Sequence, residues 1–174
     1  MIMKKILNLQ KSNFYKFFNF VYKFNNLYIV IMQVFIIDTP LYTASILDKK
    51  RLHKQVVECK QIINALEGKT NAWANHPAVL QYKNDIEWLK RYMMCLMSYR
   101  EGDMQNAIKY SYHANLYTPE WHSNEYYIQM KRRLYTKDPN YYKYFEKFGT
   151  SDTNWYFVNN EWRYYQNGKQ LKKL

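Results

Sequence analysis

One acidic side chain, Glu58, stands among basic and apolar neighbours. It lies between Val57 and Cys59 rather than in a solvated pattern of alternating charges. Lys54 follows Arg51 by three residues and Glu58 follows Lys54 by four, so a helix would place the three side chains near one another. Two interpretations are open. Lys54 and Glu58 form an exposed ion pair, worth a few tenths of a kcal/mol, or Glu58 is a carboxylate in a basic groove, placed for acid–base chemistry.

The net charge of the chain favours a polyanionic partner. The 174 residues include 26 Lys and Arg against 14 Asp and Glu, which gives a net charge of +12 and a pI near 9.5. Such an excess favours nucleic acid first and an anionic membrane surface second. Aromatic residues make up 19% of the chain, which excludes a disordered basic tail because this much aromatic surface must be buried or used for stacking. Basic residues alternate with tyrosines in 126–148, which suits either stacking with phosphate contact or the closing of a small core.

The histidines and cysteines do not have the spacing of a metal site. The four histidines lack i, i+4 or His-x-His spacing, and the two cysteines lack Cys-x-x-Cys spacing. We therefore expect no metal and no cofactor. His76, directly before Pro77, fits the start of a helix, with a role in the site as the alternative. His122 has two equal interpretations, a contact with a nucleic-acid phosphate or sugar, and the cap of the next helix.

Residues 1–31 differ in composition from the rest of the chain. They hold five lysines and no acidic residue, which is +5 of the net +12. The apolar run that ends this segment has no cleavage site of small residues after it, and lysines interrupt it, so neither a signal peptide nor a membrane span is expected. We expect an N-terminal extension, flexible or created by an upstream choice of start codon, with Met32 beginning the better-organised sequence. An interfacial amphipathic helix is the alternative.

Residues 32–174 are predicted to form one compact domain, a mainly α helical bundle with a small C-terminal β-hairpin in the tail 152–174. Leu52, Val56, Cys59 and Ile63 form an apolar stripe on the first long helix, 46–66, for which Ser45 is the predicted cap. Further helices are predicted over 77–101, from Asp103 to 117, and over 124–135. The hairpin pairs 155–158 with 162–165 around Asn159-Asn160, and a second turn follows at 167–168.

Several short motifs, taken in order, resemble one known family. Leu47, Leu52 and Glu58 have the spacing of two leucines and a glutamate in the first helix of the pyrimidine-dimer DNA glycosylase family of the phage endonuclease V type. Residues 139–145 are similar to its Pro-x-Trp-Tyr-Lys-Tyr-Tyr segment, with Tyr141 in place of Trp and Phe145 in place of the last Tyr. The start 32–35 and the runs 47–52 and 75–78 are also similar. The resemblance covers residues 32–148.

This resemblance implies a base-excision repair enzyme with coupled abasic-site lyase activity. In the family, an N-terminal α-amine attacks C1′ of the damaged nucleotide and expels the base, and the resulting imine permits β-elimination. An α-amine suits this step because its pKa is about 8, against about 10.4 for lysine. The amine would belong to Met32, or to Gln33 once the methionine is removed, and Glu58 would assist proton transfer. The chain departs from the family in starting at Met1, in having Gln33 for a threonine-like residue, and in having Val57 for an arginine.

The resemblance also implies damaged double-stranded DNA as the partner. Tyr142 and Lys143 match the Tyr-Lys pair of the family that contacts DNA near the lesion. The other expected DNA-contacting residues are Arg51, Lys54, His76, His122, Arg132, Arg133, Tyr141 and Tyr144. We expect a monomer in the cytoplasm, or in the interior of a host cell, without membrane contact. The alternative is a non-catalytic nucleic-acid-binding module tethered to a membrane through residues 1–31.

Overall fold

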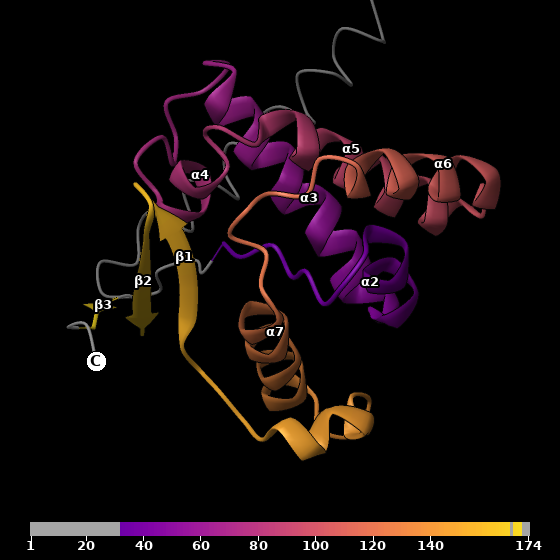
Figure 1. Cartoon of the computed structure of the whole chain (residues 1–174), viewed down its shortest axis with the longest axis vertical. Helices are drawn as coiled ribbons and strands as arrows, with labels where there is room; N and C mark the ends of the chain where they lie inside the picture. The colour runs from indigo at the N-terminus through magenta and orange to yellow at the C-terminus, as the bar shows by residue number, and fades with distance from the viewer. Residues whose placement is uncertain (1–31, 168, 172–174) are drawn as a thin grey trace, which may run out of the picture. The chain divides into compact units, whose positions relative to one another are not determined.

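A computed structural model describes residues 32–167 and 169–171, so the predictions for residues 1–31 lie outside the described part. Its helices are α2 (Pro40–Ile46), α3 (Lys49–Leu66), α4 (Pro77–Gln81), α5 (Ile86–Glu101), α6 (Met104–Asn115) and α7 (Asn124–Lys137) (Figure 1). They are followed by the 3-10 helix η1 (Lys143–Phe148) and by the strands β1 (Asn154–Val158), β2 (Glu161–Gln166) and β3 (Lys169–Gln170), which form an antiparallel sheet. This confirms a mainly α fold with a small C-terminal β element.

The helices pack in neighbouring pairs. The α5 helix lies against both α3 and α6, α4 contacts β1, and α7 contacts η1 (Figure 1). In the described part of the chain, no helix has the length and apolar character needed to span a bilayer.

The first long helix begins later than predicted. Ser45 is not its cap, because it lies in the last turn of the separate helix α2. Thr39 caps α2 and Pro40 occupies its first turn, a position that favours proline because no backbone donor is lost there. Leu47 then takes an extended conformation, and Asp48 caps α3 by accepting a 3.0 Å hydrogen bond from the backbone of Arg51.

The predicted helix over 77–101 is two helices, α4 and α5, with a break at residues 82–85. Tyr82 is fully buried in the break, where its ring stacks on Trp88 with 6.3 Å between the centroids. The carboxylate of Asp85 accepts a 2.9 Å hydrogen bond from the indole of Trp121 and makes no capping bond to α5. Tertiary contacts therefore fix a bend that the apolar periodicity does not indicate.

The later elements agree closely with the prediction. Asp103 caps α6 through the backbone N–H of Asn106, and α7 extends to Lys137. The cap of α7 is Ser123, so the interpretation of His122 as the cap is wrong. The β1–β2 turn has positive φ at Asn159 and Asn160, 54° and 59°, as a tight hairpin turn between right-twisted strands requires.

An extended segment, residues 32–37, passes through the core without joining the sheet. Its side chains are buried, so its backbone polar groups need partners inside the protein. Tyrosine hydroxyls supply three of them, donating from Tyr156, Tyr126 and Tyr92 to the carbonyl oxygens of Met32, Val34 and Phe35. Two of these tyrosines come from α7 and β1, so the C-terminal half of the chain holds this segment in place.

Candidate active site

Glu58 lies in the interior, against the extended segment. Its side chain is 6% exposed, whereas the side chain of Lys54 is 59% exposed, with Nζ 3.6 Å from Glu58 Oε1. The backbone N–H of Gln33 also donates to the carboxylate. Burial raises the pKa of Glu58 to about 7, although Lys54 and the bond from Gln33 act in the opposite direction. The interpretation of Glu58 as one half of an exposed pair is therefore wrong.

Gln55 joins Glu58 to the extended segment. Its Nε2 donates to Glu58 Oε2 at 2.8 Å and to the carbonyl of Gln33 at 3.0 Å, and its Oε1 accepts from the backbone of Phe35 at 2.7 Å. The side chain is 1% exposed. Sequence analysis did not select Gln55. The indication available there was an amide on the apolar face of the helix, one turn before Glu58.

The three predicted catalytic residues come together. The backbone nitrogen of Gln33 is at the Glu58 carboxylate, and Met32 directly precedes it with its carbonyl held by Tyr156 at 2.8 Å. Gln33 is 3% exposed, and within the described residues neither polar atom of its side chain has a hydrogen-bond partner. A buried, unsatisfied amide is costly, so the side chain of Gln33 retains unused hydrogen-bonding capacity in the interior.

A basic pocket of about 460 Å³ opens beside this corner. It is formed by the start of α3 and the end of α7, and its lining residues are Phe35, Asp48, Lys50, Arg51, Lys54, Gln55, Lys137 and Asp138. Packing around the Lys137 ammonium lowers its pKa, as do the charges of Arg133, Lys54 and Arg51, while Glu58 has the opposite effect. The basic residues of the lining outnumber the two carboxylates, so the pocket is suited to phosphate.

Tyr142 lies beneath this pocket, with its side chain fully buried. Its hydroxyl donates to Asp48 Oδ2 at 2.7 Å and accepts from the backbone N–H of Asp48 at 3.2 Å. Arg51 is 2.6 Å from the same Asp48 oxygen, and its guanidinium lies 5.3 Å from the centre of the Tyr142 ring. Tyr142 thus orders the beginning of α3 and the position of Arg51.

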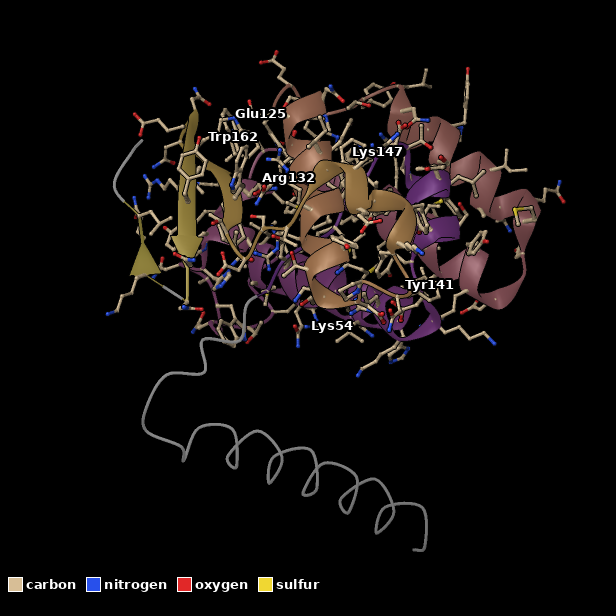
Figure 2. All side chains as sticks on the ribbon, turned by 90° about the horizontal axis from the view of Figure 1, so that it is seen from below. Lys54, Glu125, Arg132, Tyr141, Lys147 and Trp162 are labelled. Atoms are coloured by element: carbon tan, nitrogen blue, oxygen red, sulfur yellow. The ribbon has the colours of Figure 1, made fainter. Side chains whose placement is uncertain are left out.

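The residues on either side of Tyr142 in the sequence lie at the surface. Tyr141 and Tyr144 are 49% and 48% exposed, and Lys143 is also exposed. In Figure 2, Lys54 and Tyr141 project at the same edge of the molecule. Tyr142 therefore closes the core, as one of the two interpretations of this region expects. Tyr141 and Tyr144 remain accessible, and their stacking on bases stays a prediction.

The two arginines of α7 bind backbone of the following loop. Arg132 Nε donates to the carbonyl of Phe148 at 2.6 Å, and Arg133 Nη1 donates to that of Asp152 at 2.9 Å. Arg133 is 4% exposed, whereas Arg132 is partly accessible (Figure 2).

The two candidate histidines lie outside the basic pocket. His76 caps α4, with Nδ1 accepting from the backbone of Ala78 at 3.1 Å, which confirms the prediction of a helix start. The ring of His122 packs edge-on against Trp88 and Trp121, with centroids 4.6 and 4.2 Å away, and burial lowers its pKa to about 3. Among the described residues, no group of His, Cys, Asp and Glu side chains has the arrangement of a metal site.

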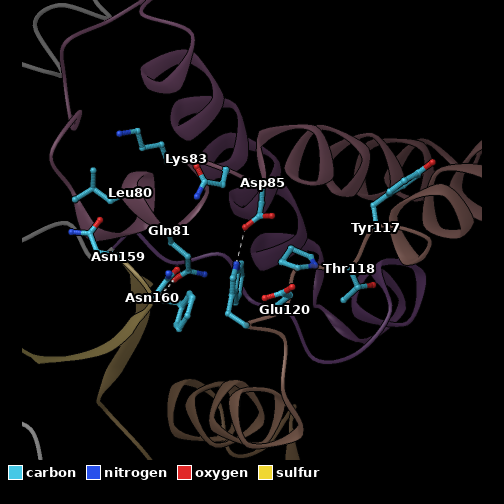
Figure 3. Close-up of a pocket in the computed structure, with 13 residues that line it drawn as sticks. Leu80, Gln81, Lys83, Asp85, Tyr117, Thr118, Glu120, Asn159 and Asn160 are labelled. Atoms are coloured by element: carbon cyan, nitrogen blue, oxygen red, sulfur yellow. Dashed lines mark hydrogen bonds between the residues drawn. The ribbon is translucent and has the colours of Figure 1, made fainter.

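A second pocket of about 460 Å³ lies at the break between α4 and α5 (Figure 3). Its lining includes Lys83, Asp85, Glu120 and Asn160, a mixture of both charges and amides, and none of the predicted site residues. The Asp85–Trp121 hydrogen bond crosses it (Figure 3). It lacks the predominantly basic lining of the first pocket.

One family model matches part of the chain. Residues 32–100 match the model of the family described as pyrimidine dimer DNA glycosylase, which confirms the suspected resemblance over this range. The similar segment at 139–145 lies outside the match. No curated protein and no solved structure matches the chain. The matched range contains the extended segment and α3, and therefore Gln33, Gln55 and Glu58. It ends before α7 and η1, which complete the basic pocket and its surroundings.

Proposed function

We propose that the protein excises pyrimidine dimers, or a related damaged base, from double-stranded DNA and then nicks the strand at the abasic site. The family match supports glycosylase activity. The contact between the backbone nitrogen of Gln33 and the buried carboxyl of Glu58 is the observation that supports the amine-based mechanism.

In this proposal, an α-amine at Gln33, or at Met32, attacks C1′ of the damaged nucleotide, and the glycosidic bond breaks with its electron pair leaving on the base. The ring-opened sugar carries an imine at C1′, a proton leaves C2′, and the C3′–O bond breaks to release the phosphate. A carboxyl with a pKa near 7 occurs in both forms at neutral pH. Glu58 would therefore accept the proton of the attacking amine and return it later.

The basic pocket and the exposed tyrosines near it would bind the DNA. Lys54 and Arg51 in the basic pocket would contact backbone phosphates, while Tyr141 and Tyr144 offer rings for stacking on unpaired bases. Reaching C1′ requires the damaged nucleotide to leave the helix. We assign Tyr142 a positioning role, since it is buried. As DNA contacts, Lys143, Arg132, Arg133, His76 and His122 stay predictions.

The test is a strand-nicking assay on a duplex with one pyrimidine dimer, using the full chain and a shortened chain that begins at Gln33. We expect excision, and a covalent protein–DNA product when borohydride reduces the imine. The shortened chain should react faster because its α-amine is free. If neither chain excises a base or gives an adduct, the proposed function is wrong, and tight binding without excision would favour the non-catalytic module.

A further inference from the structure

The basic pocket contains a lysine to which neither the family resemblance nor the mechanism above gives a role. Lys137 is the last residue of α7 and lines the pocket together with Lys54 and Gln55, which both contact Glu58. Among the ion pairs of the described residues, Lys54 pairs with Glu58, and Arg51 pairs with Asp48 and with Asp138. Lys137 takes part in none of these pairs. Its side chain is exposed and belongs to the pocket lining, so its amine is accessible from the pocket.

We propose that Lys137 is a second imine-forming amine of this site, acting on abasic sites that already exist in DNA. The inference rests on the proposed function, because the same pocket must admit an abasic sugar. It extends that function, since strand cleavage at a ready-made abasic site would not need the α-amine of Gln33 or Met32.

The reaction is a β-elimination in which atoms and charges balance. Neutral Nζ of Lys137 adds to the C1′ aldehyde of the ring-opened sugar, and loss of one water gives the C=N bond. A proton leaves C2′, with Glu58 as the acceptor, and the electron pair of that C–H bond forms the C2′–C3′ double bond. The C3′–O bond then breaks and the phosphate departs with its electrons. Hydrolysis of the imine restores the lysine.

The environment of Lys137 favours the neutral amine that this step needs. Packing of protein around the ammonium group lowers its pKa, and so do the positive charges of Arg133, Lys54 and Arg51. Lysines made nucleophilic by desolvation and by a second cation are a known route to imine catalysis. Lys54 differs, because its Nζ is paired with the Glu58 carboxylate at 3.6 Å and its side chain is 59% exposed. Of the two pocket lysines near Glu58, Lys137 is therefore the better nucleophile.

The decisive experiment locates the adduct. The full chain is mixed with a duplex that carries one abasic site, the imine is reduced with borohydride, and the protein is digested so that mass spectrometry identifies the modified residue. We expect the sugar remnant on Lys137. Lys137→Arg keeps the positive charge but cannot form the imine, so it should lose this adduct while binding the duplex within about 2-fold of the original affinity. Lys60→Arg, an exposed lysine of α3 outside the pocket, is the matched control and should keep the adduct.

A chemical rescue separates a missing amine from a damaged fold. In Lys137→Cys, alkylation with bromoethylamine rebuilds a side chain that ends in an amine, and both native cysteines are fully buried, so the new thiol is the reactive one. The rescued variant should regain the adduct. An adduct on the α-amine or on Lys54, with trapping unchanged in Lys137→Arg, would overturn the role of Lys137 and leave the proposed function standing. No adduct on any residue, together with no excision of dimers, would overturn both.

Discussion

Glu58 holds its proton to a higher pH than a carboxyl group in water does, because burial raises its pKa to about 7. Its side chain is 6% exposed, and Lys54, its ion-pair partner among the described residues, approaches no closer than 3.6 Å. Burying a carboxylate with so little compensation is expensive, and the raised pKa is the consequence. Residues kept in such a state tend to occur at functional sites, where a pKa near the working pH permits proton transfer.

Replacing this carboxyl tests its role in the chemistry directly. Glu58→Gln keeps the size and hydrogen-bonding ability of the side chain but removes proton exchange, so nicking of dimer-containing DNA should fall by about 100-fold or more. Binding of the same duplex, measured by gel shift, should change little. Glu87→Gln, an exposed carboxylate at the start of α5, is the control and should nick normally. Normal nicking by Glu58→Gln would remove Glu58 from the mechanism.

The same residue makes folding stability depend on pH. The pKa of Glu58 rises from 4.5 to about 7 on folding, so the folded state holds its proton more tightly than the unfolded state. Stability from this group is complete below about pH 4.5 and is lost as pH rises through 7, by up to about 3 kcal/mol. Urea unfolding at pH 5 and pH 8 should show this loss in the original protein and not in Glu58→Gln. An equal pH dependence in both proteins would contradict the burial of a protonated Glu58.

At the residue scale, the sequence predicted that Arg51, Lys54 and Glu58 lie near one another, but it did not predict that Glu58 is buried. The spacing of Arg51, Lys54 and Glu58 indicated one helical face. The resemblance implied an α-amine at Met32 or Gln33, which stays a prediction. Burial of Glu58 was not predictable, because it depends on the extended segment, which lies some 20 residues earlier, as the Phe35–Gln55 contact shows. Gln55 was missed because a glutamine on a mostly apolar face usually has no assigned role.

At the element scale, the extended segment 32–37 positions the site. It makes no strand pairing, so its place depends on side-chain hydrogen bonds from Gln55 and from three tyrosines. Local sequence predicted α6, α7 and the hairpin well, because caps and turn residues such as Asp103, Ser123 and Asn159 act over a few positions. It failed at the break in residues 82–85, where burial of Tyr82 and the Asp85–Trp121 bond override helical periodicity.

Tyr156 provides a test of how the extended segment 32–37 is held in place. Tyr156→Phe removes the 2.8 Å bond to the carbonyl of Met32, which is 1% exposed and would be left unpaired. We expect a loss of about 1–3 kcal/mol in the free energy of unfolding. Nicking by the still-folded variant should also fall, since Met32 and Gln33 are no longer fixed at Glu58. Tyr164→Phe, on the partly exposed strand β2, is the control and should change neither quantity. An unchanged Tyr156→Phe would mean that other contacts suffice to hold the segment.

At the scale of the whole molecule, the site is assembled from both ends of the described chain. The Asp48–Tyr142 bond joins residues 94 apart in sequence, and the Tyr156–Met32 bond joins residues 124 apart. The family match covers the buried carboxyl and the extended segment but not α7, which supplies Lys137. No sequence pattern relates Lys137 to Lys54, because only the packing of α7 near the start of α3 brings both to one pocket.

The distribution of charge over the molecule predicts how DNA binding responds to salt. Each phosphate contact that a protein makes lowers log K by about 0.9 per unit increase in log salt concentration, because counterions are released from the DNA. Lys50 and Lys54 line the basic pocket, whereas Lys60 lies on the same helix outside it. We therefore expect Lys50→Gln and Lys54→Gln each to reduce the magnitude of the slope by about 0.9, and Lys60→Gln to leave it unchanged. Fluorescence anisotropy with an abasic duplex over a range of salt concentrations measures these slopes. Equal slopes for all three variants would show that the DNA backbone does not run along the pocket, and the assignment of this face to DNA would then be wrong.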